Sequence, residues 1–95
     1  MGGTRVGVMS DWKLFVKAGC PWCVEAEAFL RDGGYAYEAV ECRGVTEAMK
    51  ELEAVSGQTL TPTLLIGEPG EGLILADFGV PELEDFLAEN GLVRG

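Results

Sequence analysis

The stretch KAGCPWC, residues 17–23, places two cysteines two residues apart directly after an apolar run, Trp12–Val16. Five residues of mostly apolar or aromatic character predict a short strand over that run. From Pro21 onward the apolar residues recur at helical spacing, and proline suits the first position of a helix because its missing N–H would have no partner there. The stretch therefore predicts a junction between a strand and a helix at Cys20.

The remaining patterns give the order of elements along the chain. Glycines at 33–34 end the first helix, and a strand is predicted over 35–42. A second helix is predicted over 45–55 and stops at Gly57. Two strands over 62–66 and 73–78, joined by a turn at 67–72, precede a last helix from Pro81 to Asn90. Thr46 is the expected N-cap of the second helix. Both strand–helix–strand units are expected to join parallel neighbours, and the tight turn an antiparallel pair.

The order β-α-β-α-β-β-α predicts an α/β fold, a three-layer sandwich in which a four-stranded mixed sheet has helices on both faces. With 95 residues, of which 47% are hydrophobic, the chain fits one domain around one core. We therefore expect a single domain over residues 1–95, in which residues 1–10 are a flexible lead-in.

The charge balance excludes some classes of partner. The formal net charge is −9, from 16 acidic and 7 basic residues, which argues against nucleic acid and against an anionic membrane surface. No apolar run approaches the roughly 20 residues that span a bilayer, and residues 1–10 lack the apolar stretch of a secretory signal. We expect a cytoplasmic, monomeric protein.

The two cysteines at the junction differ in their surroundings. Free backbone N–H groups and the helix dipole point at the sulfur of Cys20 and favour its thiolate, and Lys17 adds a positive charge nearby. Cys23 lies almost one turn into the helix and is directed inward. We therefore expect Cys20 to attack disulfides and Cys23 to resolve the adduct.

Two other roles for the pair are weaker. A structural zinc site needs four ligands, but the chain has no histidine and Cys42 is its only other thiol, so no metal is expected. A structural disulfide between Cys20 and Cys23 would close too short a loop to stabilise the fold much. Cys42 itself is either an incidental thiol or a site of glutathionylation, and Arg43 beside it is a candidate source of positive charge.

A second informative pair is Thr61–Pro62. Proline at the first position of a strand is compatible with simple strand initiation. The alternative is a cis peptide bond, which proline makes accessible. A cis bond would turn the backbone of Thr61 outward, where it could pair with an extended substrate.

These residues resemble the glutaredoxin family of the thioredoxin fold, in its dithiol CPWC form. The resemblance lies in LFVKAGCPWC at 14–23, in SGQTLTP at 56–62 and in the order of elements, and it covers residues 12–90. It implies a thioredoxin-like sandwich and glutathione as co-substrate. Oxidised or glutathionylated proteins would be its partners.

The resemblance also implies roles for individual residues. Cys20 would attack a glutathione mixed disulfide and Cys23 would resolve it. The resemblance assigns substrate binding to two groups: Lys17 and Gln58 at the glycyl carboxylate of glutathione, and Pro21, Trp22, Thr61 and Pro62 along the groove beside the thiol.

The chain departs from the family pattern in one turn. Glutaredoxins usually carry Gly-Gly-x-Asp after the last strand, where it holds the γ-glutamyl end of glutathione. Here the stretch is DFGVPE, residues 77–82: Gly79 fits the second glycine, Phe78 replaces the first, and Pro81 falls where Asp is expected. Asp77 is a possible compensating ligand.

Three functions follow. The leading hypothesis is a glutathione-dependent thiol–disulfide oxidoreductase. The altered turn motivates an alternative, a redoxin reduced by a flavoprotein of the thioredoxin-reductase type. A third is an iron–sulfur carrier in which two protomers hold a 2Fe–2S centre through Cys20 and glutathione.

Overall fold

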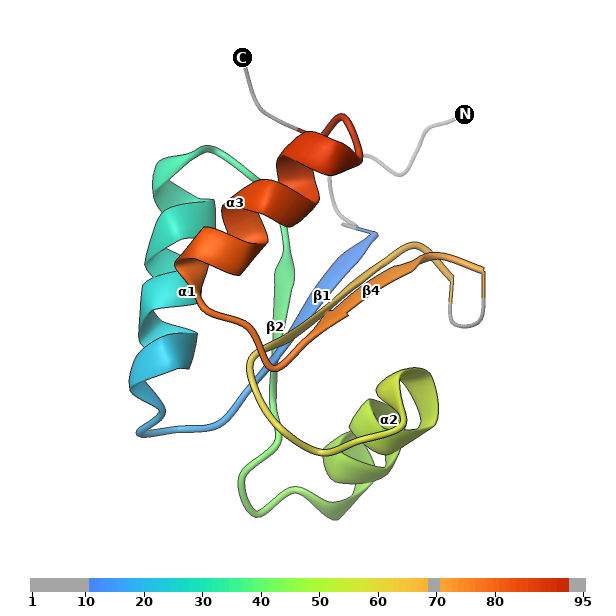
Figure 1. The fold of residues 1–95 in the computed structure, drawn as a ribbon. Helices are drawn as coiled ribbons and strands as arrows, with labels where there is room; N and C mark the ends of the chain where they lie inside the picture. The colour runs from blue at the N-terminus through green and yellow to red at the C-terminus, as the bar shows by residue number, and fades with distance from the viewer. Residues whose placement is uncertain (1–10, 69–70, 93–95) are drawn as a thin grey trace, which may run out of the picture.

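A four-stranded sheet forms the middle layer of the molecule. The computed structural model describes residues 11–68 and 71–92, and the expected flexible lead-in at 1–10 lies outside them. The elements follow the predicted order: β1 Trp12–Val16, α1 Pro21–Asp32, β2 Glu38–Glu41, α2 Thr46–Ser56, β3 Thr63–Ile66, β4 Leu73–Ala76 and α3 Val80–Glu89 (Figure 1).

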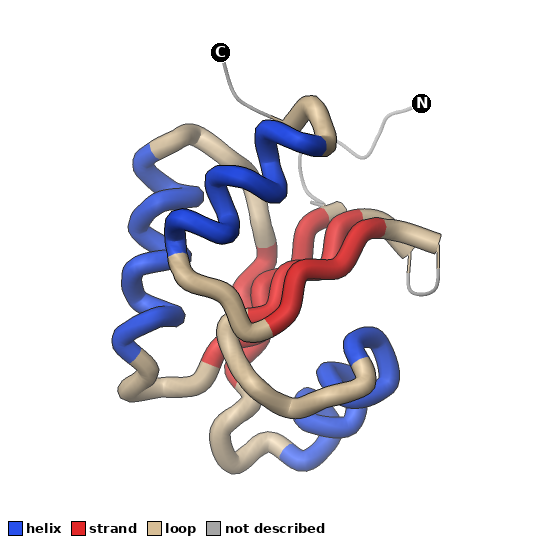
Figure 2. The backbone as a smooth tube through the Cα atoms, viewed as in Figure 1, coloured by secondary structure: helices blue, strands red, loops and turns tan. Residues whose placement is uncertain are grey.

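Helices cover both faces of this sheet, as predicted. The strand order is β2-β1-β3-β4. α1 and α3 lie together on one face, whereas α2 lies on the other (Figure 2). One buried cluster joins the sheet to α1 and α3 through residues such as Leu14, Leu30 and Leu83, and a second joins it to α2 through Phe15 and Leu52. The fold is therefore a three-layer α/β sandwich.

The prediction that both strand–helix–strand units are parallel is wrong for the second unit. β1 and β2 are parallel, but β3 runs antiparallel to β1, with Phe15 opposite Thr63 and Trp12 opposite Ile66. The physical reason is the path of the chain, because α2 and the loop after it return to the sheet at the edge where β1 ends (Figure 1). The amino end of β3 consequently lies beside the carboxyl end of β1.

Three strands are shorter than predicted. β2 starts at Glu38 because Tyr35 belongs to the end of α1: its N–H donates to the carbonyl of Leu30 at 3.0 Å, and its ring stacks on Trp12 with centroids 5.2 Å apart. β4 ends before Asp77, whose φ of 55° leaves the extended region. β3 begins one residue after Pro62.

The helix starts also differ from the predictions by one residue. The N-cap of α2 is Val45 and not Thr46, which is the first helical residue, and no side chain caps this end. α3 begins at Val80 and not at Pro81, because Gly79 takes the N-cap position, where its backbone N–H donates to the carboxylate of Glu82.

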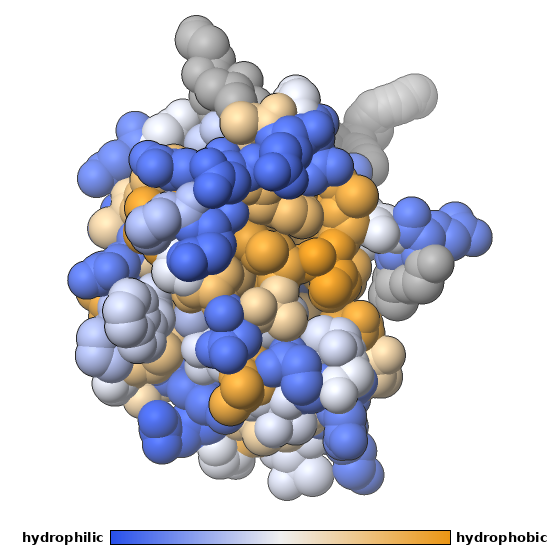
Figure 3. Space-filling model, in the orientation of Figure 1, coloured by the Kyte–Doolittle hydropathy of each residue, from blue (hydrophilic) through white to orange (hydrophobic). Residues whose placement is uncertain are grey.

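The edge strand β4 carries an apolar surface. β4 pairs with β3 on one side only, and its residues are half-buried except for Leu73, which is exposed. In Figure 3 apolar atoms gather below α3, over this part of the sheet, between more hydrophilic borders. No helix in the described part of the chain is long and apolar enough to cross a membrane.

The packing of α1 predicts the cost of truncating its buried face. Leu30 is fully buried between α1 and the sheet, so Leu30→Ala should lower the free energy of unfolding by about 2–5 kcal/mol through lost contacts and a residual cavity. Val24 in the same helix is 65% exposed, and Val24→Ala should change it by no more than about 0.5 kcal/mol. Urea unfolding of the two variants measures the difference, and equal stabilities would contradict this placement of α1.

Candidate active site

Cys20 stands at the junction between β1 and α1, where the sequence predicted it. It is the N-cap residue of α1, with Pro21 at the helix start. Its Sγ accepts a hydrogen bond from the backbone N–H of Cys23 at 3.3 Å and one from the hydroxyl of Thr61 at 3.9 Å. All three cysteines are free thiols, and Cys20 is half-buried whereas Cys23 is buried. The sulfur that solvent can reach is therefore that of Cys20.

The two thiols of the pair have opposite pKa shifts. Burial opposes ionisation of Cys20, but hydrogen bonds from Cys23, Thr61 and the backbone N–H of Trp22 outweigh it and lower the pKa of Cys20 below its ordinary value. Burial, reinforced by the hydrogen bond that Cys23 makes to Cys20, raises the pKa of Cys23. Cys20 therefore loses its proton more readily than Cys23, and Cys23 stays protonated.

The turn that leads into Cys20 is tied to the end of β2. One carboxylate oxygen of Glu41 accepts from the N–H of Ala18 at 3.0 Å and from the N–H of Arg43 at 2.8 Å. The guanidinium Nε of Arg43 in turn donates to the carbonyl of Ala18 at 2.7 Å. Both side chains therefore position this turn, and no local sequence pattern predicts this role for Glu41.

The loop before β3 closes the other side of the thiol. The Thr61–Pro62 peptide bond is cis, which confirms the second of the two interpretations of this pair. Thr61 faces Cys20, and the carbonyl of Pro62 accepts from the N–H of Asp77 at 2.9 Å. Lys17 donates from Nζ to the carbonyl of Thr59 at 2.8 Å, which links the two loops around the thiol.

Gln58 lies in this loop but supports it from within. Its Nε2 donates to Ser56 at 2.7 Å and to Thr63 at 3.1 Å, and its Oε1 accepts from the N–H of Leu60 at 2.7 Å. An amide nitrogen has two N–H donors, so both are occupied. The expected contact of Gln58 with a substrate carboxylate would require one of these bonds to break.

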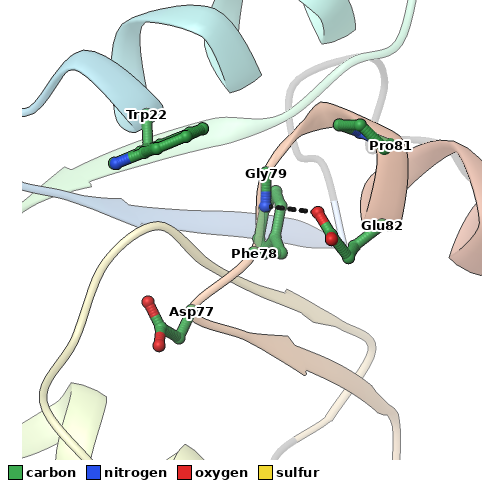
Figure 4. A pocket seen from close by; sticks show the side chains of 6 residues that line it. All are labelled: Trp22, Asp77, Phe78, Gly79, Pro81 and Glu82. Atoms are coloured by element: carbon green, nitrogen blue, oxygen red, sulfur yellow. Dashed lines mark hydrogen bonds between the residues drawn. The ribbon is translucent and has the colours of Figure 1, made fainter.

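A pocket of about 550 Å³ adjoins the start of α1. Figure 4 shows Trp22 on one side and the Asp77–Gly79 segment across from it, with the first turn of α3 beyond. Trp22 is 59% exposed, as a groove wall would be, but Phe78 is only 4% exposed and belongs mainly to the core. The pocket is lined by Trp22, Asp77, Phe78, Gly79, Pro81 and Glu82.

The two walls of this pocket approach each other closely at Gly79. The N–H of Gly79 donates to Oε1 of Glu82 at 3.0 Å (Figure 4). A Cβ at this position would lie 3.1 Å from that oxygen and 3.5 Å from the ring of Trp22, so glycine allows the two walls to approach. Sequence reasoning missed Glu82, although a glutamate at the third position of a helix was a readable signal for a side chain that accepts from the N–H of the N-cap residue.

Cys42 stands apart from the pair. It is fully buried in the cluster that α2 covers, and burial raises its pKa. Both properties disfavour reaction with small thiols in the folded protein. Residues 11–68 and 71–92 contain no group of three or more Cys, Asp or Glu side chains arranged to hold a metal ion.

Comparison with known proteins agrees with the fold. The family model for glutaredoxin matches residues 13–69. A glutaredoxin of Pseudomonas aeruginosa is 32% identical over 59 residues, which are 62% of this chain and 70% of that protein. The hybrid peroxiredoxin hyPrx5 of Haemophilus influenzae is 32% identical over 81 residues, 85% of this chain, and the chain spans only 31% of its length.

The crystal structure of the thioredoxin-like protein BC3987 aligns with a TM-score of 0.67 and 26% identity, covering 80% of this chain and 99% of that one. The fold is therefore thioredoxin-like, and its site is a dithiol pair at a strand–helix junction. The chain belongs to the glutaredoxin family. Membership of this family supports a thiol–disulfide redox function.

The hydrogen bond from Thr61 can be tested directly. Thr61→Val keeps the shape of the side chain but removes the donor to Cys20, so the pKa of Cys20 should rise. The pH at which Cys20 is alkylated at half its maximal rate should therefore move upward, as followed by mass spectrometry of the Cys20 peptide. Thr59→Val is the matched control, since only the backbone carbonyl of Thr59 contacts the site. An unchanged profile for Thr61→Val would contradict the role of this bond.

Proposed function

We propose that the protein is a dithiol oxidoreductase that reduces protein disulfides and glutathione mixed disulfides, with Cys20 as nucleophile, Cys23 as resolving thiol and glutathione as reductant. The observation that carries the proposal is the asymmetry of the pair: the pKa of the accessible thiol is lowered and that of the buried thiol is raised. Enzymes that exchange disulfides need this division between an attacking and a resolving thiol.

The proposed reaction proceeds in two displacements. The thiolate of Cys20 attacks one sulfur of the substrate disulfide, the second substrate sulfur leaves as a thiolate and is protonated by solvent, and a mixed disulfide forms. Cys23 then loses its proton to solvent and attacks the sulfur of Cys20, which releases the substrate as a thiol and leaves a Cys20–Cys23 disulfide. Two glutathione molecules return the pair to two thiols and leave as glutathione disulfide.

Residues around the pair have supporting roles in this scheme. Thr61 and the N–H of Cys23 stabilise the thiolate of Cys20 before it attacks the substrate disulfide in the first step. Trp22, at the start of α1, and Thr61, in the loop before β3, both lie near Cys20 and would flank a bound substrate. An extended substrate backbone would pair with Thr61 on the outer side of this loop.

Serine variants separate the two steps. Cys20→Ser should reduce every disulfide exchange to the uncatalysed rate, because the attacking sulfur is gone. Cys23→Ser should still turn over a small glutathione mixed disulfide in the presence of glutathione, but it should lose reduction of an intramolecular protein disulfide. The assay couples glutathione disulfide to its reductase and NADPH, and full activity of Cys20→Ser would refute the assignment.

A second candidate, a redoxin fed by a flavoprotein, is favoured by one observation. The N–H of Gly79 already donates to Glu82, and the pocket beside it is lined by carboxylates, so the turn offers little to the γ-glutamyl carboxylate of glutathione. Turnover with a thioredoxin-reductase-type flavoprotein and none with glutathione would select this candidate. The reverse result would select glutathione.

A further inference from the structure

The pocket that adjoins the start of α1 combines an exposed aromatic wall with charged lining residues. Trp22, two residues after Cys20, forms the wall and is 59% exposed. Across from it, the N–H of Asp77 donates to the carbonyl of Pro62, the residue after Thr61, whose hydroxyl reaches Cys20. Both sides of the pocket are therefore connected to residues that contact the thiol, so the pocket lies within reach of a chain bound at Cys20.

The charges in this pocket have one sign. Its ionisable lining residues are Asp77 and Glu82, both exposed, and no basic side chain lines it. The basic residues near the thiol, Lys17 and Arg43, donate instead to the carbonyls of Thr59 and Ala18. With a net charge of −9 on the whole chain, the pocket repels anions and attracts cations.

The carboxylate of Glu82 and the backbone of Asp77 are held in position. Oε1 of Glu82 accepts from the N–H of Gly79 at 3.0 Å, which leaves Oε2 for a ligand. Asp77 is fixed through its backbone, by the bond from its N–H to Pro62 at 2.9 Å. An ammonium or guanidinium group in this pocket would gain ionic attraction to a lining carboxylate and cation–π attraction to the ring of Trp22.

We propose that this pocket binds a Lys or Arg side chain of the polypeptide whose disulfide Cys20 attacks, so that the preferred substrates carry a basic residue next to the reactive cysteine. The inference rests on the proposed function and adds its substrate class. Apolar contact with Trp22 and Pro81 would hold the stem of the long side chain, and the carboxylates of Asp77 and Glu82 would hold its charged end.

Synthetic peptides test the proposal without glutathione or a reductase. Each peptide has one cysteine in a mixed disulfide with thionitrobenzoate, and the residues on both sides of that cysteine are Lys, Ser or Glu. The thiolate of Cys20 attacks the peptide sulfur, thionitrobenzoate leaves as a coloured thiolate, and the peptide remains on Cys20 until Cys23 displaces it. The rate of colour release by the reduced full-length protein, minus that of Cys20→Ser, reports the first step.

The Lys peptide should react about tenfold faster than the Glu peptide at low ionic strength, with the Ser peptide between them, and added salt should reduce the ratio. The double variant Asp77→Asn, Glu82→Gln should bring the ratio to about threefold or less. Both substitutions keep local structure, because asparagine tolerates a positive φ and the amide oxygen of glutamine can still accept from the N–H of Gly79.

Glu47→Gln together with Glu53→Gln is the matched control. Both residues are exposed on α2, on the opposite face of the sheet, so this variant makes the same change in net charge and should keep the full ratio. Equal rates for the Lys and Glu peptides, or an equal loss of preference in both double variants, would overturn the inference. If no peptide reacts faster than with Cys20→Ser, the proposed function itself fails and the inference fails with it.

Discussion

The antiparallel pairing of β1 with β3 is the constraint on which the site depends. It sets Phe15 opposite Thr63, so the chain that leaves β1 and the chain that enters β3 meet at the same end of the two strands. Cys20 follows from the first segment and Thr61 belongs to the second, with 3.9 Å between their sulfur and oxygen atoms. If β3 ran parallel to β1, Cys20 and Thr61 would lie at opposite ends of the strands, and the sulfur would lose one of its hydrogen-bond donors.

Buried hydrogen bonds then fix the entering loop. Thr63 is fully buried, yet its hydroxyl donates to the carbonyl of Leu60 at 2.8 Å and accepts from Gln58 at 3.1 Å. Losing either partner would leave a buried polar group unsatisfied, at a cost of about 1–3 kcal/mol. Thr63 and Gln58 therefore set where Thr61 stands without touching the thiol.

Much of this arrangement could be predicted from local sequence patterns. The strand–helix junction at Cys20 and the cis bond before Pro62 were readable because each depends on a few neighbouring residues. The direction of β3 was not readable, since it depends on how α2 crosses the sheet. Nor was the network between Glu41 and Ala18, 23 residues apart, which exists only after β1 and β2 have paired.

In the altered turn before α3, the carboxylate of Glu82 takes the place at the helix N-terminus that the carboxylate of a ligand could otherwise occupy. A helix N-terminus favours a negative group, and in this chain Glu82 supplies it from within, through its bond to Gly79. A site that fills its own anion position gains little from a second carboxylate. What the turn still offers is the outward oxygen of Glu82 and the carboxylate of Asp77, both of which attract cations. In our proposal, the residues that would weaken a contact with glutathione are thus the same residues that would favour a basic polypeptide as substrate.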